Sequence, residues 1–137
     1  MIIGVPKEIK DGEHRVSLTS IGAEMLAAQG HRVLVETAAG LAAGMPDDAY
    51  RQAGAEILAD IRAVYQQAEM IVKVKEILPP EYPLLREGQV LFTYIHSANK
   101  PDQTQVLLDS KVVGIAYENV TADGREFRLL TPMSEIA

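Results

Sequence analysis

A chain of 137 residues is long enough for one compact domain with its own core and too short for two ordinary ones, so we expect one domain over residues 1–137. Hydrophobic residues make up 47% of the sequence and charged residues 23%, a composition typical of globular domains that excludes disordered and fibrous classes. The 13 lysines and arginines against 19 aspartates and glutamates give a formal net charge of -6, which offers no electrostatic basis for binding nucleic acid.

The first elements predict a strand–helix–strand unit. Ile2–Val5 is a short apolar run with the composition of a buried strand. Thr19 is placed to cap a helix and Gly30 to end it. The apolar stripe of that helix is predicted to comprise Ile21, Met25 and Leu26. The next strand is predicted at Val33–Val35.

The middle of the chain predicts two short helices around a small strand. The helices are expected at Asp47–Gly54 and Asp60–Ala68, with the strand at Ala55–Leu58 between them. A longer strand follows at Met70–Val74, in which Lys73 is predicted to lie near a wet edge. A rigid loop comes next, formed by Pro79, Pro80 and Pro83.

The last third predicts two more strands, Val90–Tyr94 and Val112–Tyr117, joined by a helix that Pro101 opens. Most predicted strands are hydrophobic almost throughout, as in a parallel sheet buried on both faces. Strands that alternate with helices predict an α/β fold with a doubly wound, mainly parallel sheet and flanking helices, Rossmann-like or flavodoxin-like. The sequence contains no Gly-x-Gly-x-x-Gly, so we expect this sheet without a dinucleotide fingerprint.

The sequence gives no support for a thiolate or metal site, a membrane span or a signal peptide. The chain has no cysteine, which excludes disulfides and thiolate chemistry and fits a reducing compartment. No apolar run approaches the roughly 20 residues of a membrane span, and the start lacks the order of a signal peptide. His14 and His31 show no ligand spacing, so no metal is expected. We therefore expect a cytoplasmic protein with neither a membrane nor a nucleic acid as partner.

Four polar residues follow predicted strands, where ligands bind in open α/β sheets. They are Arg15, Lys75, His96 and Glu118. An arginine grips a carboxylate through two parallel hydrogen bonds, and a lysine can polarise a carbonyl oxygen. Histidine titrates near neutral pH and can move a proton. Together these residues predict a site for a small acid.

Each of these residues also has a plainer interpretation. Arg15 fits a surface ion pair, and Lys75 fits an exposed lysine paired with Glu76. His96 fits a structural imidazole, and Glu118 a carboxylate that positions Arg15.

Several segments, in a fixed order from end to end of the chain, carry a family resemblance. They are Met1-Ile-Ile-Gly-Val-Pro-Lys-Glu-Ile-Lys10, Glu13-His-Arg15-Val, Gly30-His-Arg-Val-Leu-Val-Glu36, Lys73-Val-Lys75-Glu76, Leu91-Phe-Thr-Tyr-Ile-His96, Ile115-Ala-Tyr-Glu118 and Leu129-Leu-Thr-Pro-Met133-Ser134-Glu135. The chain thus resembles the amino-terminal, substrate-binding part of bacterial alanine dehydrogenases.

The resemblance implies a function and a role for each site residue. The family interconverts L-alanine with pyruvate and ammonia using NAD, and is commonly hexameric, which implies a homo-oligomer. Arg15 and Lys75 would bind the substrate, and His96 would be the catalytic acid/base. Met133 and Ser134 would approach the nicotinamide. A dinucleotide-binding domain would be supplied in cis or in trans, so we expect the chain to be inactive alone.

Some departures and alternatives accompany the resemblance. Ile77 stands where the family usually has proline, and Ser97 begins a more polar stretch than usual after His96. A fragment of a related saccharopine dehydrogenase or transhydrogenase is one alternative. A non-catalytic module that binds a small acid or a protein partner is another.

Overall fold

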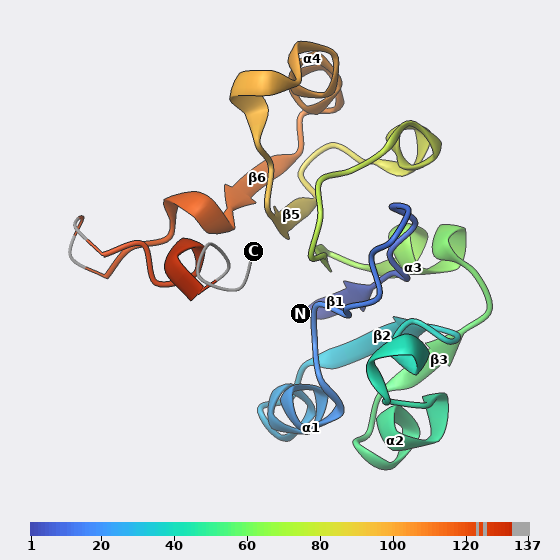
Figure 1. The fold of residues 1–137 in the computed structure, drawn as a ribbon. Coiled ribbons are helices and arrows are strands. Elements are labelled where there is room, and N and C mark those ends of the chain that lie inside the picture. Colours follow the sequence, from blue (N-terminus) through green and yellow to red (C-terminus); the bar gives the residue numbers. More distant parts are fainter. Residues whose placement is uncertain (123, 125, 133–137) are drawn as a thin grey trace.

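The computed structural model describes residues 1–122, 124 and 126–132, and its centre is a six-stranded sheet in the order β3-β2-β1-β4-β5-β6 (Figure 1). The strands are β1 Ile2–Val5, β2 Arg32–Glu36, β3 Glu56–Leu58, β4 Met70–Val72, β5 Val90–Thr93 and β6 Val113–Ala116. Every neighbouring pair is parallel. The predicted doubly wound α/β fold is confirmed, and its strand order reverses between β1 and β4.

Helices cover the two faces of this sheet. They are α1 Ser20–Ala28, α2 Asp47–Gln52, α3 Ile61–Gln67 and α4 Pro101–Ser110, with short 3-10 helices η1 Leu41–Ala43, η2 Pro79–Leu84, η3 Ser97–Asn99 and η4 Tyr117–Asn119. In Figure 1, α1 and α2 lie on one face, whereas α3, η2 and α4 lie on the other. As predicted, Thr19 caps α1, because its hydroxyl accepts a hydrogen bond from the Gly22 amide.

Each face has its own apolar core. Val5, Val33 and Val35 pack with Tyr50 of α2 on the first face. On the second face, α3 and η2 pack on a cluster made by Val64, Tyr65, Ala68, Ile71, Ile77 and Leu91. Glycine at position 4 of β1 lets α3 approach, since a Cβ atom there would lie 2.7 Å from the Ala68 Cβ.

The structure corrects several local predictions. Ile21 and Met25 of α1 are 69% and 62% exposed, so the predicted apolar stripe is wrong for both. The helix instead packs through the small Ala23 and through Leu26, which lie three residues apart on one side. The proline loop forms the 3-10 helix η2. In the described part of the chain, no helix has the length and apolar character needed to cross a membrane.

Candidate functional site

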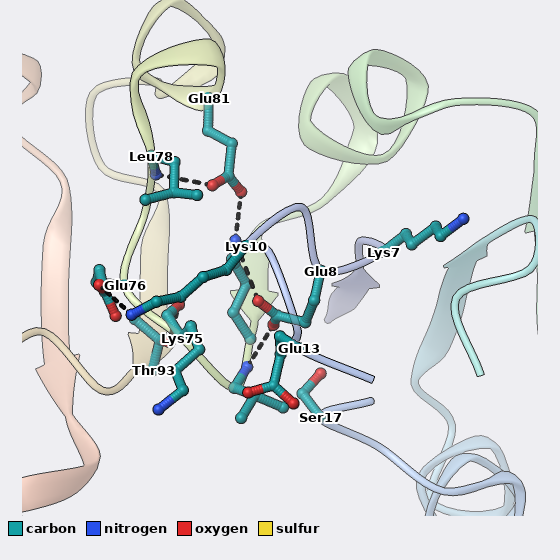
Figure 2. A network of polar contacts seen from close by, with 12 residues as sticks. Lys7, Glu8, Lys10, Glu13, Ser17, Lys75, Glu76, Leu78, Glu81 and Thr93 are labelled. Atoms are coloured by element: carbon teal, nitrogen blue, oxygen red, sulfur yellow. Dashed lines mark hydrogen bonds and ion pairs between the residues drawn. The ribbon is translucent and has the colours of Figure 1, made fainter. Parts of the chain in front are cut away.

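The candidate site lies where the strand order reverses, at the carboxyl ends of β1 and β4. The loop of residues 6–19 follows β1, and hydrogen bonds attach it to the end of β4 and to the segment after that strand. The Ser17 hydroxyl donates to the Val72 carbonyl oxygen at 2.7 Å, and the Val74 amide donates to the Glu8 carboxylate at 2.7 Å. Figure 2 shows Glu8, Glu13, Ser17 and Lys75 gathered at this junction.

Two of the predicted site cations act on one carboxylate, that of Glu13. The guanidinium of Arg15 donates two hydrogen bonds to it, from Nε at 2.8 Å and from Nη2 at 2.6 Å. These bonds lower the pKa of Glu13 to about 2, and the charge of Lys75 acts in the same direction. The backbone of Lys75 is held from β5, because Thr93 donates its hydroxyl hydrogen to the Lys75 carbonyl oxygen at 2.7 Å.

His96 is linked to Arg15 through Tyr94. The rings of Tyr94 and His96 stack, with centroids 5.9 Å apart and planes at 12°. Burial raises the pKa of Tyr94, Glu118 raises it further, and the nearby charge of Arg15 opposes them. Arg15, Lys75 and His96 thus follow β1, β4 and β5, three neighbouring parallel strands whose carboxyl ends lie at one edge of the sheet.

The ion pairs suggested as plainer interpretations of Arg15 and Lys75 have different outcomes. Arg15 does form an ion pair, with Glu13. The predicted partner of Lys75 is taken by others, because one oxygen of Glu76 lies 2.8 Å from the Lys10 Nζ and 2.6 Å from the Lys100 Nζ. Burial raises the pKa of Glu76, but the hydrogen bonds from these lysines outweigh it and lower the value to about 2.

The structure corrects the predicted location of Lys73. It was expected near a wet edge, but it is 1% exposed and its Nζ lies 2.6 Å from a Glu81 oxygen. A second carboxylate, Glu8, lies 3.6 Å away, and the Tyr65 hydroxyl donates to the same Glu81 oxygen at 2.9 Å. Burial raises the pKa of Glu8, against the pull of Lys73. This buried ionic cluster supports the segment that runs from the end of β4 to Lys75.

Glu118 also differs from its predicted role. Its carboxylate accepts hydrogen bonds from the backbone amides of Ile95 and His96, whereas the sequence suggested that it positions Arg15. The remaining two predicted site residues, Met133 and Ser134, lie outside the described residues.

The NAD that the family resemblance implies does not fit the described residues of this sheet. In a dinucleotide-binding sheet with this strand order, a glycine-rich turn after β1 carries the pyrophosphate. Here the loop of residues 6–19 contains Gly12 as its one glycine. It also holds the carboxylate of Glu13, which lies 2.6 Å from the Arg15 guanidinium and would repel a phosphate there.

Comparisons with known proteins agree with this architecture. The family model described as "Alanine dehydrogenase/PNT, N-terminal domain" matches residues 4–137. The chain belongs to this family. It is 54% identical over 137 residues to an alanine dehydrogenase of Methanococcus maripaludis and 58% identical to one of Bacillus subtilis. It covers 37% and 36% of those relatives, so it spans little more than a third of their length.

Solved structures give the same result. A structure titled "L-alanine dehydrogenase" matches the whole chain with a TM-score of 0.96 at 47% identity, and 38% of that chain is covered. A transhydrogenase from Sinorhizobium meliloti matches 91% of this chain and 36% of its own with a TM-score of 0.83 at 26% identity. The family resemblance predicted from the sequence segments is confirmed.

Three residues of the site were missed from the sequence alone. Glu13 lies two residues from Arg15 and has the opposite charge, which was a usable signal. Tyr94 is two residues from His96, the spacing that places side chains on one side of a strand. Glu8 gave no signal, because its contact with Val74 joins positions 66 residues apart.

Proposed function

We propose that this chain forms the substrate-binding wall of an NAD-dependent L-alanine dehydrogenase, which interconverts L-alanine with pyruvate and ammonia. The observation that carries the proposal is that Arg15, through two hydrogen bonds, and Lys75, through its charge, both act on one carboxylate, that of Glu13. Glu13 occupies the position that a substrate carboxylate would need. A small 2-oxo or 2-amino acid fits because it carries one carboxylate and one adjacent polar group.

Each residue has a role that its chemistry supports. The planar fork of Arg15 binds the substrate carboxylate with two hydrogen bonds, in exchange for its contacts with Glu13. Lys75, fixed by Thr93, donates to the carbonyl oxygen of pyruvate and draws electron density from it. His96 gives or takes the proton on that oxygen or on the nitrogen that replaces it.

We infer that NAD binds a part of the protein other than the residues described. The purified chain should therefore not oxidise NADH in the presence of pyruvate and ammonia, because the loop after β1 does not fit the cofactor's pyrophosphate. Addition of the matching dinucleotide-binding domain as a separate polypeptide should restore weak turnover. Robust turnover by the chain alone would contradict this part of the proposal.

A transhydrogenase-type role is the second candidate, favoured by the 0.83 TM-score with such a protein. The identities of 54% and 58% to alanine dehydrogenases against 26% to the transhydrogenase favour the first candidate. The pairing of Lys75 with His96 also favours it, because we do not expect transhydrogenases to retain both residues.

The test is a pyruvate titration of the chain, followed by NMR. Pyruvate should shift resonances of Lys75 and His96 with a dissociation constant on the order of millimolar, because about two charge-assisted contacts form in an open site. Arg15→Ala should abolish these shifts. Arg32→Ala is the matched control, since Arg32 is an exposed arginine paired with Glu56 away from the site. Shifts that ignore Arg15 would contradict the assignment of the site.

A further inference from the structure

His96 has an unusual backbone. Its φ is 52° and its ψ is 40°, in the left-handed region, where only a few per cent of non-glycine residues lie, although asparagine, aspartate and histidine are enriched among them. His96 lies between β5, which ends at Thr93, and η3, which begins at Ser97, and the chain turns sharply at this residue. Such a conformation persists only where the surrounding structure enforces it. The contacts around His96 therefore have to stabilise this turn.

The carboxylate of Glu118 supplies the most direct contacts. One of its oxygens, Oε1, accepts the His96 amide at 2.7 Å and the Ile95 amide at 3.0 Å. The second oxygen lies 3.2 Å from the Ile95 amide. Both amides lie beyond the ladder between β5 and β6, whose paired residues end at Thr93 and Ala116. A single side chain thus satisfies two backbone donors that have left the sheet.

Two further side chains, from α4 and from the residue after η3, have contacts near the same turn. The buried Gln103 of α4 donates its side-chain amide to the Ile95 carbonyl oxygen at 2.8 Å. Lys100, which follows η3, is tied to Glu76 at 2.6 Å. The Ile95–His96 peptide is therefore held at its N–H from η4 and at its carbonyl oxygen from α4, and the N–H of the preceding peptide is also held from η4.

We propose that Glu118 is a positioning residue for His96, which fixes the left-handed turn that aims the imidazole at the site. This inference rests on the proposed role of His96 as the acid/base residue. Glu118 does not touch the substrate in this arrangement. It acts through the backbone, so the position of its acceptor oxygen decides whether the two amides are bonded.

The position and the charge of the acceptor define the variants for the test. Glu118→Gln keeps the length of the side chain and an oxygen acceptor but removes the charge. Glu118→Asp keeps the charge but shortens the side chain by one methylene, which withdraws the acceptor from both amides. Glu87→Asp is the matched control, because Glu87 is an exposed glutamate in contact only with Lys111 among the described ion pairs.

The first measurement is amide hydrogen exchange of the chain, followed by NMR. We expect exchange at His96 and Ile95 to be on the order of tenfold faster in Glu118→Asp and within about threefold of the wild type in Glu118→Gln and Glu87→Asp. Equal protection in Glu118→Asp and in the wild type would overturn the proposal. So would faster exchange spread evenly over the chain, since that indicates a general loss of stability.

The second measurement separates this inference from the proposed function. In the pyruvate titration, Glu118→Asp should retain the shift at Lys75 and lose the shift at the His96 ring, and Glu118→Gln should retain both. Retention of both shifts in Glu118→Asp would overturn the positioning role. If pyruvate binds nowhere in the wild type, the proposed function fails, while the exchange rates still decide whether Glu118 holds the turn.

Discussion

The two halves of the sheet are packed in different ways. The strands β1, β2 and β3 lie between helices on both faces, and the central residues of β2, Val33 to Val35, are 1% exposed or less. On the other side of the strand reversal, η2 and α4 cover one face of β4, β5 and β6 (Figure 1). Val113 and Ile115 of β6 are 50% and 40% exposed. One half is closed, whereas the other is open.

This difference explains how the candidate site is held. Arg15 and Lys75 come from the boundary between the halves, where the buried cluster of Lys73, Glu8 and Glu81 supports the backbone. His96 comes from the open half. Its turn depends on polar contacts from Glu118 and Gln103 rather than on apolar packing. The closed half provides a rigid base, and side-chain hydrogen bonds position the residues that extend from the open half.

The largest predicted loss of stability concerns the buried ionic cluster at the boundary between the two halves of the sheet. Lys73→Met should destabilise the chain by about 3–5 kcal/mol, because it leaves the carboxylates of Glu81 and Glu8 buried without their cation. Urea denaturation monitored by circular dichroism measures the loss. Lys111→Met is the control: Lys111 has a side chain that is 67% exposed, and its loss should cost less than about 0.5 kcal/mol. Equal effects of the two variants would show that the ionic cluster does not support the fold.

A pair of glycines compares the two halves directly. Gly4→Ala in β1 should cost about 1–3 kcal/mol, since its Cβ would lie 2.7 Å from the Ala68 Cβ and 2.8 Å from the Val64 Cγ1 on α3. In β6, Gly114→Ala would meet only the flexible end of Ile95 at 3.2 Å, so its effect should stay below about 0.5 kcal/mol. Thermal unfolding of both variants tests the contrast. A larger loss from Gly114→Ala would reverse our assignment of the closed and open halves.

Much of the fold could be predicted because its signals are local. Apolar runs marked the six strands, and capping residues such as Thr19 and Pro101 marked helix starts. Strand ends were less accurate: the strand predicted at Met70–Val74 ends at Val72. The Val74 amide leaves the ladder to bind Glu8, a contact between positions 66 residues apart that no local pattern contains.

The grouping of the candidate site residues rests on a different signal. Parallel strands end at one edge, so Arg15, Lys75 and His96 could be grouped before their contacts were known. Their surroundings could not be predicted, because these depend on which chain segments meet in space. Lys73 illustrates this limit: its burial follows from the position of Glu81 in η2, and within its own strand it looked like an exposed lysine.

A smaller, pH-dependent effect tests the ion pairs of Glu76 with Lys10 and Lys100. The pKa of Glu76 falls from an ordinary 4.5 to about 2, so its contribution to stability is present above pH 4.5 and is lost as the pH falls toward 2. Glu76→Gln should cost about 1–2 kcal/mol at pH 7, because hydrogen bonds from Lys10 and Lys100 lose their charged acceptor. Unfolding curves from pH 7 to pH 2 should bring the variant and the wild type together. A constant difference across that range would contradict the role of the carboxylate charge.

The smallest effect is expected at the far end of the open half. Ile115→Thr should change the free energy of unfolding by less than about 0.5 kcal/mol, because Ile115 is 40% exposed on the last strand of the described sheet and threonine keeps the β-branched shape. The same change at Val33, which is 1% exposed, should cost at least about 1 kcal/mol, since it buries a hydroxyl in the closed core. Both variants should be unfolded in urea at two protein concentrations about tenfold apart. If Ile115→Thr costs more than about 1 kcal/mol only at the higher concentration, a second copy covers β6 in solution. A cost of that size at both concentrations would mean that β6 is packed within the chain itself, and the contrast between the two halves would fail.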